Sequence, residues 1–154
     1  MCLLIEARDS GKRFARRASL LQAKRLYRRR SALDVNYYPV DTSQLENLAG
    51  QTMASFLLLV GPECNGVSIP VIPARLFLDL VERGQPSTQI APADASRLGK
   101  GIGAWLVEDV IGLWTGDWMA AIVNRAEGGK DREPFLLVEM VVERVRKGPD
   151  GWVS

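Results

Sequence analysis

Apolar residues gather in two short runs near the middle of the chain. Ser55–Val60 reads SFLLLV and Gly66–Val71 reads GVSIPV, and the turn-forming sequence GPECNG lies between them. Short runs bounded by glycine and proline are typical of strands, so we expect two strands joined by a short turn. A helix is expected next, over Pro73–Arg83, because apolar residues recur there at steps of three and four and Gly84 follows as a cap.

A second, longer helix is predicted from Asp94 or Ser96 to about Trp114, where one apolar face repeats at helical spacing. That face consists of Leu98, Ile102, Trp105, Leu106, Val110 and Leu113. The same stretch contains several glycines, each of which costs up to about 1 kcal/mol relative to alanine inside a helix, so its stability must come from packing. Beyond it, Trp118–Val123 and Phe135–Val145 predict two further strands around a long turn.

The N-terminal stretch is strongly basic and is predicted to form a helical arm. Residues 1–30 hold ten Lys and Arg against two acidic residues, a net charge of +8, whereas residues 31–154 carry a net charge of −6. Lysine and arginine are good helix formers, so we expect a helix from about Lys12 to Arg29, with only a partial apolar stripe. Residues 31–50 are rich in turn-forming side chains and are expected to link this arm to the body.

These elements predict an α+β fold, with one or more small antiparallel sheets packed with two helices, plus the basic N-terminal helical arm. The domain organisation is an arm over residues 1–30, a linker over 31–50 and an α+β domain over 51–154. A chain of 154 residues with 47% hydrophobic and 25% charged residues is typical of one soluble globular domain. The sequence ends at Ser154, just inside a last expected strand, which leaves two alternatives: the N-terminal part of a longer protein, with the domain truncated at its C-terminus, or a short native tail.

Several residue types are missing or rare, and this restricts the chemistry. The chain has no histidine, two cysteines and no run of 18 apolar residues, which argues against histidine-based catalysis, histidine-containing metal sites and a transmembrane span. Cys2 and Cys64 are best interpreted as reduced thiols in a reducing compartment, with a single disulfide as the alternative.

No motif of nucleotide binding or catalysis is complete. The sequence LGKGIG around Lys100 satisfies neither of the common glycine-rich phosphate-binding patterns. Glu108 and Asp109 are adjacent on the second predicted helix, where neighbouring side chains diverge by about 100°, so they do not form a facing acid pair. Cys64 follows Glu63 rather than a cation that would lower its pKa. We therefore expect no enzymatic activity, no cofactor and no metal.

Surface tryptophan and the basic arm are the best candidates for partner binding. Trp105 and Trp114 lie about 180° apart on a helix, so one of them must point away from the core unless the second sheet covers it. An exposed tryptophan is a strong interface anchor. The candidate partner-binding residues are Arg16, Arg17, Arg28, Arg29, Trp105 and Trp114. For the arm, a solvated helix without a partner and a phosphate-binding helix remain alternatives.

The middle of the chain resembles a known family of assembly proteins. The segments SFLLLVGPECNGVSIPVIPARLFLDLVERG and DASRLGKGIGAWLVEDVIGLW look like the N-terminal region of type III secretion cytoplasmic-ring proteins of the YscQ/HrcQ type, relatives of the flagellar switch proteins FliM and FliN. The shared features are a short hairpin leading into a helix with proline and leucine, and a following helix with acidic residues after Leu106. The resemblance covers residues 55–115, about 40% of the chain.

This resemblance implies a non-enzymatic adaptor of the secretion sorting platform. Its expected partners are platform subunits, either the ATPase stator or the membrane-proximal adaptor, and its expected place is the cytoplasm, peripheral to the inner membrane through those partners. No C-terminal switch-type domain follows residue 154, which puts ring assembly through such a domain in doubt. The alternative is a nucleic-acid-associated regulatory protein that uses the basic arm.

Overall fold

The computed structural model describes residues 1–27, 36–84, 88–111, 116–118 and 137–144. Six strands form one mixed sheet in the order β7-β5-β4-β2-β1-β8, and two short strands, β3 and β6, pair separately. The strands are β1 (Cys2–Asp9), β2 (Lys12–Arg25), β3 (Tyr38–Pro39), β4 (Ser55–Val60), β5 (Pro70–Pro73), β6 (Gln89–Ile90), β7 (Lys100–Gly101) and β8 (Leu137–Arg144). The helices are α1 (Thr42–Gln51), α2 (Ala74–Glu82), α3 (Pro92–Leu98), the single turn α4 (Ile102–Ala104) and the π-helix η1 (Trp105–Ile111).

The predicted helical arm is wrong, because Lys12–Arg25 forms the longest described strand, β2. β2 returns antiparallel along β1 after a tight turn in which Ser10 and Gly11 have φ of 51° and 76°. Two successive positive φ angles are the mark of a two-residue hairpin turn. Helix propensity is a weak local preference, and the pairing of β2 with two neighbouring strands overrides it.

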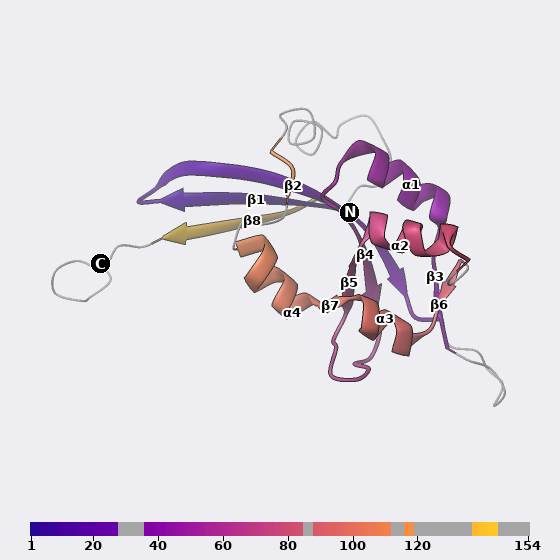
Figure 1. The fold of residues 1–154 in the computed structure, drawn as a ribbon. Coiled ribbons are helices and arrows are strands. Elements are labelled where there is room, and N and C mark those ends of the chain that lie inside the picture. Colours follow the sequence, from indigo (N-terminus) through magenta and orange to yellow (C-terminus); the bar gives the residue numbers. More distant parts are fainter. Residues whose placement is uncertain (28–35, 85–87, 112–115, 119–136, 145–154) are drawn as a thin grey trace.

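β2 connects the two halves of the sheet. It pairs antiparallel with β1 from Lys12 to Leu20 and parallel with β4 from Leu20 to Arg25. Residues Lys12–Arg17 therefore extend beyond β4, and Figure 1 shows β1, β2 and β8 projecting together away from α1 and α2. β8 pairs parallel with β1 on the other side, so the sheet is mixed rather than antiparallel as predicted.

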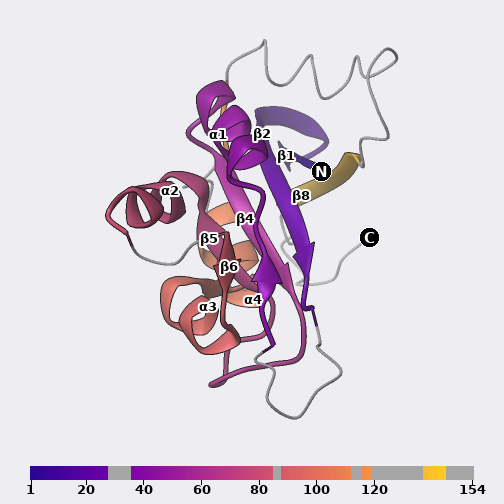
Figure 2. The same ribbon diagram turned by 90° about the vertical axis from the view of Figure 1, so that its right-hand side faces the viewer.

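Alternate residues of β4 build the two sides of the core. Leu57 and Leu59 pack with α1 and α2, where Phe77 is fully buried. Phe56 and Leu58 point to the opposite side and pack with η1. Figure 2 shows the same division, with α1 and α2 in front of the sheet and the orange α4 segment behind it.

The region predicted as a linker contains the helix α1. Asp41 caps it, since its carboxylate accepts a hydrogen bond from the backbone N–H of Gln44 at 3.0 Å. Gln22 of β2 donates to the carbonyl oxygen of Asp41 at 3.0 Å and to Oε1 of Gln44 at 2.8 Å. These bonds attach the start of α1 to the central strand, so this part of residues 31–50 belongs to the folded body.

The predictions for the middle of the chain are partly confirmed. β4 has the predicted bounds, and α2 matches the helix expected at Pro73–Arg83. β5 begins later than predicted. The long helix expected to reach Trp114 is wrong, because the chain breaks at Gly99 between α3 and α4 and forms β7. A Cβ at Gly99 would lie 2.7 Å from Cβ of Pro70, so glycine is what permits the close contact with β5 there.

The C-terminal predictions are confirmed only where the structure describes the chain. β8 lies within the strand expected at Phe135–Val145. The strand expected at Trp118–Val123 falls outside the described residues beyond Trp118, as do the final turn and the last expected strand. The α+β class is confirmed.

Trp105 is a core residue, and its removal should destabilise the fold. Its side chain is only 4% exposed and meets Phe56 edge-on, with ring centroids 5.3 Å apart. We expect Trp105→Ala to lower the free energy of unfolding by about 3–5 kcal/mol, as measured by urea denaturation. Trp118 is 78% exposed, so Trp118→Ala is the control and should change stability little. Equal effects of the two substitutions would contradict this assignment.

Candidate functional site

The projecting end of the hairpin carries a row of cations. β2 contributes Lys12, Arg13, Arg16 and Arg17, and β1 contributes Arg8. Because residues alternate between the two faces of a strand, Arg16 pairs across from Glu6 while Arg17 pairs across from Ile5 on the other face. The row of basic residues is therefore held on a strand, at fixed spacing, and not on a helix as the sequence suggested.

Glu6 organises the cations on one face. Its carboxylate accepts a hydrogen bond from Nε of Arg8 at 2.6 Å and lies 3.6 Å from Arg13 and 3.7 Å from Arg16. The hydrogen bond from Arg8 is the main reason that the pKa of Glu6 lies below its usual value, and the three nearby positive charges add to it. Three guanidinium groups therefore surround one carboxylate, and Glu143 of β8 lies at the same end of the hairpin, where its carboxylate accepts a hydrogen bond from the backbone N–H of Gly11 at 2.9 Å.

The three predicted partner-binding residues that the structure describes, Arg16, Arg17 and Trp105, do not lie together on one surface. Arg16 and Arg17 lie on the hairpin, on opposite faces, and Arg17 packs close to Gly116, where a Cβ would be 2.7 Å from that of Arg17. Trp105 is in the core, so it offers no surface to a partner. Arg28, Arg29 and Trp114 lie outside the described residues.

Trp118 is an exposed aromatic residue that the sequence analysis did not single out as a contact. It follows Asp117, whose backbone exchanges two hydrogen bonds with Ala18 of β2, at 2.9 Å and 2.7 Å. These bonds hold the neighbouring backbone against the hairpin and leave the indole 78% exposed. The cluster of tryptophans in the sequence was the available signal, but helical spacing directed attention to Trp105 and Trp114.

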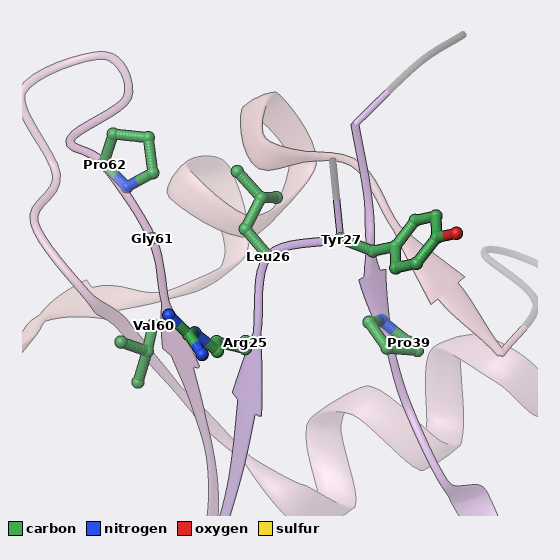
Figure 3. Close-up of a pocket in the computed structure, with 7 residues that line it drawn as sticks. All are labelled: Arg25, Leu26, Tyr27, Pro39, Val60, Gly61 and Pro62. Atoms are coloured by element: carbon green, nitrogen blue, oxygen red, sulfur yellow. The ribbon is translucent and has the colours of Figure 1, made fainter. Parts of the chain in front are cut away.

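A separate open cleft of about 820 Å³ lies where the parallel strands β2 and β4 end (Figure 3). Its lining residues come from the ends of these strands, from the segment after each, and from β3. They are Arg25, Leu26, Tyr27, Pro39, Val60, Gly61 and Pro62. Arg25 and Val60 are register partners across the two strands, so they lie side by side at the mouth. Local sequence patterns do not reveal this cleft, because it joins residues that are far apart in the chain.

Gly61 stands at this cleft because Tyr38 lies against it. A Cβ at Gly61 would collide with the hydroxyl of Tyr38 and would approach Cβ of Leu26 at 3.2 Å. Tyr38 is almost fully buried, and burial raises the pKa of its phenol. Glycine at this position therefore keeps the buried tyrosine and the cleft wall in their places.

Glu108 and Asp109 form ion pairs and not an acid pair. Both carboxylates contact Nζ of Lys100, at 3.1 Å and 2.9 Å. The hydrogen bonds, with Asp109 contributing most, raise the pKa of Lys100. This arrangement ties η1 to β7 through the side chain of Lys100.

The described residues contain no cluster of three or more cysteine, aspartate or glutamate side chains that could hold a metal ion. None of the helices in the described ranges is long and apolar enough to cross a membrane. Cys2 is buried and Cys64 is half-buried, and both are free thiols. Comparison with family models, with curated proteins and with solved structures finds no match for this chain.

The ion pairs of Glu6 should make stability depend on acidic pH. A carboxylate whose pKa is lowered by folding stabilises the protein above its unfolded pKa of about 4.3, and this contribution is lost as the pH falls through the folded pKa. We expect the difference in unfolding free energy between wild type and Glu6→Gln to be largest near neutral pH and to shrink below about pH 4. Urea unfolding over a pH series measures it.

Glu46 is an exposed glutamate on α1, and Glu46→Gln is the matched control. A difference between wild type and Glu6→Gln that stayed constant with pH would contradict the charge-based role.

The contact between Gly61 and Tyr38 predicts a specific pair of substitutions. Gly61→Ala should lower the free energy of unfolding by about 1–3 kcal/mol, since the buried ring must move to accept the methyl group. Tyr38→Phe removes the hydroxyl that collides, so the double variant should lose less stability than the sum of the two single variants. Gly50→Ala is the control, because nothing lies within 4 Å of a Cβ there. If the stability lost by the double variant in thermal unfolding equals the sum of the losses in the two single variants, the contact is contradicted.

Proposed function

We propose that this chain is a non-enzymatic assembly or adaptor protein that binds an acidic partner protein through the cations of the β1–β2 hairpin. The observation that carries the proposal is the row of basic side chains on β2 that precede its pairing with the start of β4. A strand holds these charges in place before binding, which reduces the entropy lost when a partner is bound. Complementary charge would also speed the encounter with an acidic surface.

The assembly that we propose for this adaptor is the cytoplasmic platform of a type III secretion system. The support is the sequence resemblance over residues 55–115, together with the order of a strand, a second strand and a helix in β4, β5 and α2. In this proposal the partner is the ATPase stator or the membrane-proximal adaptor, and the chain is cytoplasmic and peripheral to the inner membrane through that partner.

Nucleic acid is the second candidate partner, because the same cations could neutralise phosphates. The position of Glu6 argues against it. Its carboxylate lies among Arg8, Arg13 and Arg16 and forms an ion pair with each of them. It would therefore repel a phosphate that approached these guanidinium groups. A protein partner can place a carboxylate beside the exposed Lys12, which is not one of the three cations around Glu6.

The proposal predicts a loss of binding when two exposed hairpin charges are removed. The nuclease-treated chain is titrated with the purified stator subunit of a type III secretion ATPase, at low and at raised salt, by isothermal calorimetry. We expect Lys12→Gln/Arg13→Gln to weaken binding about tenfold, or about 1.4 kcal/mol, and raised salt to weaken wild-type binding.

The matched control is Arg83→Gln/Arg97→Gln, which removes two exposed cations, one at the C-cap of α2 and one in α3, and should leave the affinity unchanged. No binding of the stator at low salt would reject the secretion platform. Tight binding of a duplex DNA of random sequence, weakened by the hairpin variant, would instead favour the nucleic-acid alternative.

A further inference from the structure

The cleft at the ends of β2 and β4 has the size of a small-molecule site. Its volume of about 820 Å³ falls within the range of about 300–1,000 Å³ that is usual for such sites. It also lies at the carboxyl ends of two parallel strands, where chain segments diverge and leave a crevice between them. This cleft is separate from the charges on which the proposed function rests.

Backbone hydrogen bonds hold the walls of the cleft in place. The N–H of Leu26 donates to the carbonyl oxygen of Val60 at 3.0 Å, which joins the two strands at the base of the cleft. Tyr27 and Tyr37 exchange two backbone hydrogen bonds, at 2.8 Å and 3.2 Å, and their rings are 5.2 Å apart. Because both walls are fixed by backbone pairing, the cleft is formed before any ligand arrives.

Most of the side chains that line the cleft are apolar, and one carries a positive charge. Arg25 is the only ionised side chain among the described lining residues, and no described carboxylate pairs with its guanidinium. Figure 3 shows its nitrogen atoms beside Val60, while Tyr27 and Pro39 form the opposite wall. Tyr27 is about half exposed, so its ring is accessible to a ligand.

A guanidinium binds carboxylates in a bidentate manner, and exposed tyrosine and proline rings favour contact with a flat apolar group. Among the described lining residues a single arginine carries charge, which matches a ligand with one carboxylate. We propose that this cleft binds a monocarboxylate attached to an aromatic or branched apolar group, with the carboxylate on Arg25 and the apolar group against Tyr27 and Pro39. The same chemistry is presented by a free organic acid and by the C-terminal residue of a peptide.

The test uses the full chain and phenylacetate as the probe, with binding followed by NMR of backbone amides. We expect shifts at Gly61 and Tyr27 and a Kd of about 1 mM, given the small size of the probe. Phenylacetamide has the same shape without the charge and should bind at least about tenfold more weakly. Arg25→Gln should abolish the preference for the acid over the amide, whereas Arg83→Gln, an exposed arginine on the helix side, should retain it.

Three results would overturn the inference. They are the absence of shifts at Gly61 and Tyr27 at about ten times the expected Kd, equal binding of phenylacetate and phenylacetamide, and unchanged acid preference in Arg25→Gln. Because Arg25 is exposed, its substitution should not unfold the chain, and the amide spectrum itself reports folding.

A second experiment distinguishes a free organic acid from a peptide C-terminus as the source of the carboxylate. The tripeptide Ala-Ala-Phe is compared with its C-terminal amide and with phenylacetate. Binding of the free peptide about tenfold tighter than phenylacetate, with loss in the amide, identifies a peptide C-terminus as the ligand. Equal or weaker binding of the peptide identifies a free organic acid. Both results retain the role of Arg25, and neither depends on the stator or on the hairpin charges.

Discussion

The pairing of β2 with two different neighbours is the constraint on which the rest of the structure depends. Along β1 it forms an antiparallel hairpin, and from Leu20 onward it is also the parallel partner of β4. Without the pairing of β2 with β4, the strands β1, β2 and β8 would share no backbone hydrogen bonds with the strands β4, β5 and β7. The same strand supplies the projecting cations at one end and Arg25 at the cleft at the other end, so both candidate sites depend on its register.

That register also explains why the two candidate sites differ in character. At the hairpin end β2 has no β4 beside it, and the side chains there are exposed or half-buried and mostly charged. At the other end β4 accompanies β2 to its last residue, and apolar groups such as Val60 and Leu26 surround a single arginine. A one-residue slip of β2 would exchange its faces, which would bury Lys24 or Arg25 where apolar residues now pack.

The sequence indicated the central elements well and the N-terminal strands poorly. β4 and α2 carry strong local signals, since an apolar run bounded by glycine and proline and a helical apolar spacing each specify one structure. In Lys12–Arg25 the abundance of lysine and arginine favoured a helix, while the turn signal at Ser10 and Gly11 was the better guide. The break at Gly99 depends on contact with Pro70, and the cleft depends on the parallel pairing of β2 with β4. Such long-range pairing is not encoded in local periodicity.

The parallel pairing of β1 with β8 bears on how the chain is made. β1 is synthesised well before its outer neighbour β8, which begins only at Leu137. Throughout most of translation one edge of the β1–β2 hairpin therefore has no β8 to pair with, and apolar residues such as Leu3 and Ile5 must wait for Met140 to complete their side of the core. Contacts so distant in sequence are closed late and slowly. Chain elongation, rather than local folding, sets the moment at which this sheet can be completed.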